Sequence, residues 1–294
     1  MFNHPLVSIG MTVRNEAPFL RQSIESLLAQ DFEDFELLIS DNASQDATQA
    51  ICAESMKRDK RIHYYRNDRD LGQVGNFNSV FHRSVGKYFM WASGNDLWDP
   101  TFLSKCRAIL DQDREVVISY PLVTLIDLQG TLLLPVQSRL DTRGLDQLTR
   151  FNHVIWFIGS LPIYGLMRSA ALRQTRLMRD TLIAPDKVLL AEMALLGSFA
   201  LVGENLFFWR VHNPCLDVKR ESRRDFLKGQ FRRLLDTRRA KIRFPYWRYV
   251  CEMLNAVNIV ETTRKEKIEL YLSALFHSFL KNKGYLIRDL FLRF

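Results

Sequence analysis

The stretch that decides the fold is GKYFMWASGNDLWDP, residues 86–100. Its first half, 88–92, is a short apolar run rich in aromatic residues, which predicts a strand buried on both faces of a sheet. The run then breaks into the turn formers Ser93-Gly94-Asn95-Asp96. Asp99 and Pro100 predict the start of a helix, with Asp99 as its cap and Pro100 at its first position. A central strand that ends in a polar turn before a helix is where open α/β sheets place ligand sites.

Strand-like and helix-like segments alternate on the N-terminal side of this stretch. Further strands are predicted at 6–13, 35–40 and 62–66, and a helix follows each of them after a polar turn. Strands that alternate with helices imply a parallel sheet with right-handed crossovers. The predicted fold class is therefore α/β.

The C-terminal side continues less regularly and ends in helices. We expect a strand at 116–127 with a hairpin into 132–134, a helix beginning at Leu172, a helix at 187–196, and two last strands at 199–202 and 206–211. From about Lys219 the pattern turns helical and basic, with later helices at 246–260 and 266–280. This organisation predicts a main domain over 1–215 and a helical extension over 216–294.

Composition limits the class of protein. The chain has 294 residues, 47% of them hydrophobic, which allows a large core. There is no apolar run long enough for a bilayer span, and the first residues lack the charged and apolar regions of a signal peptide. The four cysteines are widely scattered, without metal-site or redox spacing, so reduced thiols in a cytoplasmic protein are expected.

The positive charge is concentrated in the tail. The net charge is +8, and residues 216–294 hold 19 Lys and Arg against 9 Asp and Glu. The remaining chain is slightly acidic, which argues against a nucleic-acid partner for the main domain. A cationic helix with Phe226 and Phe231 on its apolar face is suited to an anionic membrane surface. The alternative is a helix packed on the main domain with a solvated basic face.

Several short motifs, taken in order, resemble the family 2 glycosyltransferases. They are residues 7–16, 39–46 and 75–78, and Ser-Gly-Asn-Asp at 93–96 before Trp-Asp-Pro at 98–100. The resemblance implies the GT-A fold: a Rossmann-like, mixed and mostly parallel sheet flanked by helices. It also implies a nucleotide-sugar half over about 1–100 and an acceptor half over about 101–215.

The resemblance assigns donor-binding residues to the first two loops. Asp41 is expected to accept a hydrogen bond from the nucleotide base, which fits the N–H donor of uracil or thymine and hence a UDP- or dTDP-linked donor. Its alternative role is a helix cap. Thr12, Arg14 and Glu16 are expected to line the base and ribose, although Arg14 would equally suit a surface charge.

The resemblance also extends the donor site to later loops. Asn76 and Asn78 are expected to line the donor pocket, with a hydrogen-bonded core amide as the alternative for Asn78. Ser93 and Gly94 are expected beside the nucleotide sugar.

A divalent cation, Mn²⁺ or Mg²⁺, is implied, because similar enzymes carry an Asp-x-Asp motif that holds a metal against the diphosphate. Here both aligned positions are neutral, Ser93 and Asn95, and Asp96 alone keeps a carboxylate. Asn95 and Asp96 are the expected ligands. His212 is a further candidate, or else a loop histidine, and an imidazole ligand would favour Mn²⁺.

Asp186 is the expected catalytic base. It follows Pro185 at the start of a helix, where relatives carry the acidic residue that faces the acceptor, and it would take the proton of the attacking hydroxyl in one inverting displacement. A helix cap is the alternative, and Glu192 is the reserve candidate. Residues 159–165 would shape the acceptor side, with Trp156 and Tyr164 as flat surfaces for a sugar or as core aromatics.

The sequence therefore predicts an inverting glycosyltransferase acting on a saccharide or lipid-linked acceptor, in the cytoplasm or peripheral on the inner face of the cell membrane. The alternative is a catalytically lapsed relative that binds sugar nucleotide or a partner without turnover, because positions 93 and 95 have lost their acids.

Overall fold

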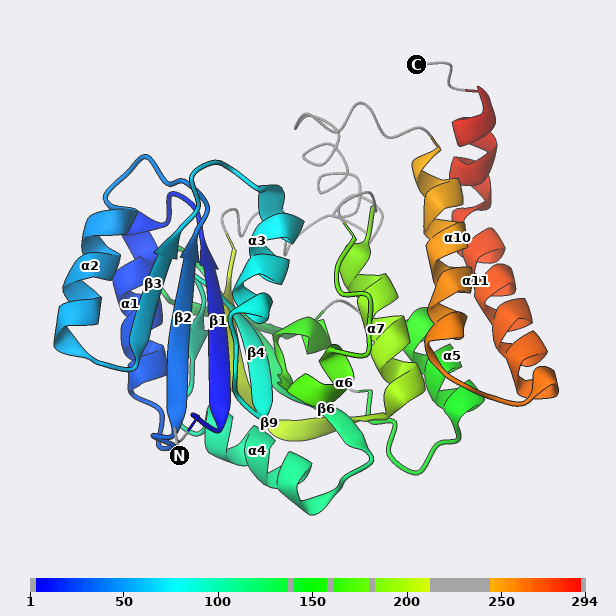
Figure 1. Cartoon of the computed structure of the whole chain (residues 1–294), viewed down its shortest axis with the longest axis horizontal. Coiled ribbons are helices and arrows are strands. Elements are labelled where there is room, and N and C mark those ends of the chain that lie inside the picture. Colours follow the sequence, from blue (N-terminus) through cyan, green and yellow to red (C-terminus); the bar gives the residue numbers. More distant parts are fainter. Residues whose placement is uncertain (1–3, 137–139, 158–160, 180–182, 212–243, 292–294) are drawn as a thin grey trace.

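A computed structural model describes residues 4–136, 140–157, 161–179, 183–211 and 244–291 of the chain (Figure 1). Its N-terminal half is a parallel sheet with helices on both faces. The strands run in the order β3-β2-β1-β4. Their bounds are β1 (Val7–Val13), β2 (Phe35–Asp41), β3 (Ile62–Arg66) and β4 (Tyr88–Ser93). The helices between them are α1 (Ala17–Leu28), α2 (Thr48–Arg58) and α3 (Gly72–His82).

Strand β4 is central and buried on both faces, as its sequence predicts. Its residues 88–92 are all fully buried. Phe89 and Trp91 pack edge-on with ring centroids 5.0 Å apart, and Trp91 donates a hydrogen bond to the carbonyl of Phe77 in α3. Tyr88, Met90 and Ala92 join the core on the opposite face, which also contains α1 and α4 (Phe102–Gln112). This burial fixes where the polar turn after β4 emerges.

The second half of the sheet continues from β4 in the order β8-β6-β9-β5, and β7 pairs with β6. The bounds are β5 (Leu97–Trp98), β6 (Val116–Ile126), β7 (Leu132–Val136), β8 (Leu166–Arg168) and β9 (Ser198–Arg210). The prediction of two last strands was wrong: β9 is continuous and runs parallel to β6. The register steps from Pro121↔Val202 to Leu122↔Asn205, so Gly203 and Glu204 form a bulge rather than a turn.

Two helix starts also differ from prediction. Helix α4 begins at Phe102, because Asp99 turns its carboxylate onto the backbone N–H of Thr101 at 2.9 Å before the helix opens. Leu172 ends the single-turn helix α6 (Ser169–Leu172) instead of opening a basic helix.

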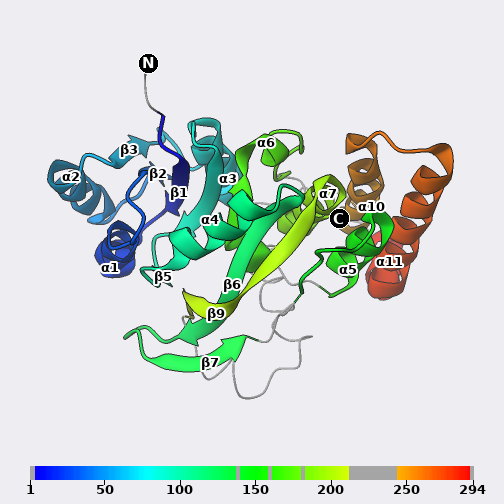
Figure 2. The ribbon, with the colours of Figure 1, turned by 90° about the horizontal axis from the view of Figure 1, so that it is seen from below.

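The remaining helices form a layer at one end of the sheet. Helix α7 (Pro185–Leu196) packs beside α5 (Gln147–Phe157), and α10 (Pro245–Ala256) and α11 (Arg264–Phe291) cover them (Figures 1 and 2). Their shared core includes Val188, Ala191, Met253 and Leu270. Short 3₁₀ turns lie at 161–164 and 257–259. None of the helices in the described part of the chain combines the length and apolarity that a membrane span requires. The predicted α/β fold class is confirmed.

Candidate functional site

The loops that follow β1 to β4 meet at one edge of the sheet. These four strands are parallel, so their carboxyl ends point the same way. Thr12 is paired in register with Ser40 on one side and Ser93 on the other. A row of small polar residues thus lies where the strands end, and the predicted donor-site residues in the first four loops share this edge.

The loops after β1 and β2 are bonded to each other. The backbone N–H of Asn15 donates to the Ser44 hydroxyl at 2.9 Å, and that of Glu16 donates to Thr48 Oγ1 at 3.0 Å. The Asn15 side chain accepts the N–H of Gln45 at 2.8 Å. Asn15 also has a left-handed backbone, with φ of 55°. Non-glycine residues rarely adopt this conformation, so the hydrogen bonds have to hold the loop in place.

Asp41 is fully buried at the end of β2 and has partners within the chain. One oxygen accepts the backbone N–H of Ser44 at 2.8 Å, and the other accepts the Tyr64 hydroxyl at 2.6 Å. The guanidinium of Arg66 lies 3.9 Å from the second oxygen. The carboxylate therefore joins β2 to β3 and to its own loop. Helix α2 begins later, after Ala47, so Asp41 is not its cap.

Arg14 reaches the loop after β3. Its guanidinium lies 2.5 Å from Asp70, and 54% of the Arg14 side chain is exposed. Asp70 also accepts a hydrogen bond from the Asn42 amide at 2.5 Å and one from the backbone N–H of Gly72 at 2.8 Å. Asn42 accepts the N–H of Leu71 in turn. The loops after β1, β2 and β3 are therefore one hydrogen-bonded unit.

The two asparagines of α3 lie in different settings. Asn76 is buried, with its side-chain oxygen bonded by Ser40 at 2.6 Å and Asn67 at 3.0 Å and its amide donating to the carbonyl of Ser40 at 2.9 Å. Asn78 donates to the carbonyl of Met178 at 2.8 Å, but its buried Oδ1 has no hydrogen-bond partner. Asn76 is bonded as a structural amide, whereas Asn78 keeps an acceptor unused.

Gly94 lets the turn after β4 pass close to the loop after β1. A Cβ at position 94 would lie 2.8 Å from Val13 Cγ1 and 3.1 Å from the Glu16 side chain. Any larger residue would push the two loops apart. The glycine therefore brings the main chain of the turn against Glu16.

Two carboxyl groups with raised pKa values lie on this side of the edge. Burial, with the nearby charge of Asp46, raises the pKa of Glu16 from 4.5 to about 7. Burial also raises the pKa of Asp96 from 3.8 to about 7, and the charge of Glu16 adds to that rise, although hydrogen bonds from the Arg210 backbone and from Ser93 oppose it. A bound cation would offset this concentration of negative charge.

Arg210, which the sequence analysis did not select, holds the turn that carries Asn95 and Asp96. Its backbone N–H donates to Asp96 Oδ1 at 2.8 Å, and its Nε donates to the carbonyl of Asn95 at 2.7 Å. Its other nitrogens donate to the carbonyls of Asp127 and Leu128 and to Gln22. The residue is 1% exposed. A lone arginine at the end of an apolar strand was the signal that could have identified it.

Tyr164 links the two acidic positions predicted to carry the reaction. The charges of both Asp96 and Asp186 raise the pKa of its phenol, beyond the larger effect of burial, and it is hydrogen-bonded to Ser93. Its ring packs on Phe207 of β9 with centroids 5.4 Å apart. Asp186 lies in the first turn of α7. Burial raises the pKa of Tyr249 in α10, and the charge of Asp186 adds to that rise. Ser93 therefore joins Asp96 to Tyr164, and Asp186 is near enough for its charge to raise the pKa of Tyr164.

Three other predicted candidates lie elsewhere or outside the described residues. Glu192 is buried and has both oxygens bonded by Arg176, so it is fully occupied as a structural partner. Trp156 packs edge-on against His277 of α11, 4.9 Å between centroids, in the helical layer. His212, with the basic segment 212–243 that includes Phe226 and Phe231, falls outside the residues that the structure describes.

The described residues do not include a ready-made metal cage. No group of three or more His, Cys, Asp or Glu side chains comes together in them. They do provide the two carboxyls of Glu16 and Asp96 with the hydroxyl of Ser93 beside them. Such oxygen donors suit a hard cation that keeps other positions for water or phosphate.

Comparison with solved structures identifies the fold. The crystal structure of Staphylococcus aureus TarS 1–349 in complex with UDP-GlcNAc aligns with a TM-score of 0.65 at 14% identity, covering 96% of this chain and 79% of that one. A mannosyltransferase from Pyrobaculum calidifontis, solved with GDP-Man and Mn²⁺, aligns with a TM-score of 0.56 at 13% identity, covering 98% and 74%. The fold is therefore GT-A, as predicted.

Sequence comparison identifies the family. The family model described as "Glycosyl transferase family 2" matches residues 8–154, and the chain belongs to this family. An uncharacterized glycosyltransferase of Methanocaldococcus jannaschii is 31% identical over 131 residues, 44% of this chain and 45% of that protein. One from Rickettsia typhi is 33% identical over 124 residues, 42% and 38%. These aligned segments span less than half the length of either relative.

Proposed function

We propose that the chain is an inverting glycosyltransferase that moves a sugar from a UDP- or dTDP-linked donor to a saccharide or lipid-linked acceptor. One observation carries the proposal: the loops after β1 to β4 meet at one edge, where Ser93 is hydrogen-bonded to both Asp96 and Tyr164 and the charge of Asp186 reaches Tyr164. The fold also supports it, since similar folds have been solved with UDP-GlcNAc and with GDP-Man.

The donor occupies the edge formed by these loops. The base lies against the loop after β2, where Asp41 holds the backbone in shape and shares its remaining acceptor capacity with the base. Thr12, Arg14 and Asn76 border the base and ribose. The diphosphate lies over the turn at Ser93 and Gly94, because the close approach that Gly94 allows brings this turn beside the loop after β1. The unused oxygen of Asn78 accepts a sugar hydroxyl.

A divalent cation fits the same place. Glu16 and Asp96 would hold it, with oxygen from Ser93 or Asn95, and diphosphate oxygens would complete its coordination. When bound, such a cation would neutralise negative charge on the leaving diphosphate. His212 remains a proposed additional ligand from sequence alone.

Asp186 acts on the acceptor. The acceptor hydroxyl oxygen attacks the anomeric carbon, the bond from that carbon to the diphosphate oxygen breaks, and the proton passes to the Asp186 carboxylate. One displacement inverts the anomeric centre. Tyr164, which is hydrogen-bonded to Ser93 and feels the charges of both Asp96 and Asp186, positions the reacting groups.

We also infer a cytoplasmic enzyme, peripheral on the inner face of the cell membrane. A lipid-linked acceptor would bring the reaction to that surface, and the basic composition of 216–294 supports contact with anionic lipid. No nucleic-acid partner is proposed.

The test combines binding and turnover. Isothermal titration of UDP, dTDP and GDP, with and without Mn²⁺, should show tighter binding of UDP or dTDP in the presence of the cation. Donor hydrolysis should occur and should be abolished in Asp186→Ala, with nucleotide binding retained. Failure to bind any of the three nucleotides would remove the proposal.

A second function, sugar-nucleotide binding without turnover, is favoured by one observation. Positions 93 and 95 are neutral, and Asp96 is 2% exposed and held by Arg210. Nucleotide binding with neither hydrolysis nor transfer across a broad acceptor panel would establish this alternative.

A further inference from the structure

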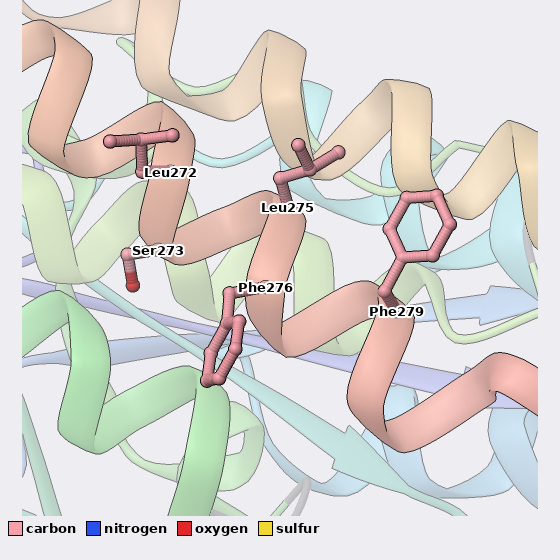
Figure 3. Close-up of a pocket in the computed structure, with 5 residues that line it drawn as sticks. All are labelled: Leu272, Ser273, Leu275, Phe276 and Phe279. Carbon is pink, nitrogen blue, oxygen red and sulfur yellow. The ribbon is translucent and has the colours of Figure 1, made fainter.

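Helix α11 carries an exposed apolar stripe. Its members are Ile268, Leu272, Leu275, Phe276, Phe279 and Leu280, with exposed fractions between 38% and 62%. Their spacing of three and four residues puts them on one face of the helix. Leu272, Leu275, Phe276 and Phe279, with Ser273, line a shallow hollow of about 510 Å³, and Figure 3 shows these side chains along the helix. A contiguous apolar surface of this kind marks an interaction site.

The opposite face of α11 is already used for packing. Leu270 and Ala274 join the core formed with α5, α7 and α10, and His277 packs edge-on against Trp156 of α5. Most of the surface of the stripe therefore points away from the core that holds the helix in place. It lies on the outermost helix of the layer (Figure 2).

Lysines mark both ends of the stripe. Lys265 lies one helical turn before Ile268, Lys283 lies one turn after Leu280, and both are exposed. Over residues 264–284 there are five Lys and Arg against two Glu, one of which, Glu269, borders the stripe. An apolar face with flanking lysines is the arrangement of helices that lie in the boundary between lipid headgroups and acyl chains.

Two tryptophans border the stripe from neighbouring helices. Trp247 of α10 packs edge-on against Phe279 with centroids 5.7 Å apart, and Trp156 of α5 lies 6.3 Å from Phe276. Both tryptophans are partly exposed. Amphipathic aromatic rings of this kind gather at the headgroup level of membranes.

The positions of the lysines disfavour a second copy of the chain as the occupant. In an antiparallel pair that matches the two stripes, Lys265 of one copy would face Lys283 of the other. In a parallel pair each lysine would face its own counterpart. Like charges would meet at both ends in either case, whereas lipid phosphates would neutralise them.

We propose that the stripe on α11 is a docking surface for an anionic lipid bilayer, with Leu272 and Phe276 at its centre and Lys265 and Lys283 on the headgroups. Docking brings the acceptor side of the molecule to the membrane, because α11 shares a core with α7, whose first turn carries Asp186. The role of docking in bringing the acceptor side to the membrane rests on the proposed transferase function. Binding of the stripe to lipid does not itself depend on nucleotide binding.

The experiment measures sedimentation of the full chain with vesicles of phosphatidylcholine, with and without phosphatidylglycerol. The wild-type chain should partition onto the vesicles that contain phosphatidylglycerol. Leu272→Ser with Phe276→Ser should weaken partitioning about tenfold to a hundredfold, because two apolar side chains leave the acyl boundary. Lys265→Gln with Lys283→Gln should weaken it about tenfold and reduce its salt dependence. Leu132→Ser with Leu134→Ser, exposed leucines of β7, is the matched control and should change nothing.

Each other result overturns the proposal. Partitioning of Leu272→Ser with Phe276→Ser that equals wild type would assign membrane binding to another part of the chain, such as the basic residues between 212 and 243. A dimer that this variant converts to monomer, with no vesicle binding, would assign the stripe to a second copy. A large fall in its unfolding midpoint would show that the chain covers the stripe itself. Titration calorimetry of the same variant with UDP tests the transferase proposal separately, because nucleotide binding should be retained whether or not the stripe binds lipid.

Discussion

The polar groups around the ends of β2 and β3 and the acidic centre beside β4 differ in the charges that surround them. Around the ends of β2 and β3, the side-chain oxygens of Asp41, Asn42 and Asn76 are paired within the chain at 2.6–3.3 Å, and the guanidinium of Arg66 lies beside Asp41. In the acidic centre, Glu16 and Asp96 instead have raised pKa values of about 7. The loops hold a shape, whereas burial disfavours the charged forms of Glu16 and Asp96, and a bound cation would favour those forms again.

This contrast divides residues that the sequence alone treats as equivalent. Asp41 and Asp96 both follow buried strands, and only their partners distinguish them. Replacing a residue of the loops should therefore reduce stability, and replacing a residue of the acidic centre or of the facing α7 should reduce activity.

The largest effect is expected at Asp186. Asp186→Asn should lower the rate of transfer about a hundredfold to ten-thousandfold, because the acceptor hydroxyl loses its proton acceptor. Affinity for the nucleotide should stay unchanged in titration calorimetry. Glu204→Gln is the control, since Glu204 is an exposed acid paired with Lys105. Equal transfer rates for the wild-type chain and Asp186→Asn would mean that another residue is the catalytic base.

The next effect compares the two asparagines of α3. Asn76→Ala should lower the free energy of unfolding by about 2–4 kcal/mol, because it removes three hydrogen bonds, two of them to the buried Ser40. Asn78→Ala should cost about 1 kcal/mol, because the side chain makes one hydrogen bond and has an unpaired oxygen. Denaturant unfolding measures both, and the reverse order would contradict the structural role assigned to Asn76.

The acidic centre should also affect the pH dependence of stability. Because burial raises the pKa of Asp96 from 3.8 to about 7, the folded state binds more protons than the unfolded state between these values. The stability of the wild-type chain, relative to Asp96→Asn, should therefore fall by about 3 kcal/mol as pH rises from 5 to 8, with most of the fall below pH 7. Denaturant unfolding in EDTA from pH 5 to 8 measures this difference. If the difference in unfolding free energy between the wild-type chain and Asp96→Asn stayed constant across that range, the raised pKa of Asp96 would be contradicted.

The smallest effect on stability is expected at Arg14. Its ion pair with Asp70 is about half exposed, so Arg14→Gln should change the free energy of unfolding by less than about 0.5 kcal/mol. Affinity for UDP should nevertheless fall about tenfold, because a charged hydrogen bond to the nucleotide is lost. A stability loss without a loss of affinity would make Arg14 part of the loop framework.

The sequence predicted the fold well because hydrophobic periodicity records which faces are buried. The run 88–92 is buried throughout, and the turn after it lies where predicted. The bulge in β9 was not predicted, because Gly203 and Glu204 read as a turn until β6 pairs on either side of them. The hydrogen-bond partners of the site residues could not be predicted from the sequence either. Arg210 and Asp70 are far along the chain from the groups they hold, and only the folded chain brings them together.

Diffraction from crystals soaked with UDP and Mn²⁺ tests the central claim most directly. The account predicts density for the diphosphate beside Gly94 and Asp96, the cation between Glu16 and Asp96, and the uracil ring against the loop that follows Asp41. Nucleotide density on another surface, or none there at concentrations that saturate binding in solution, would contradict it.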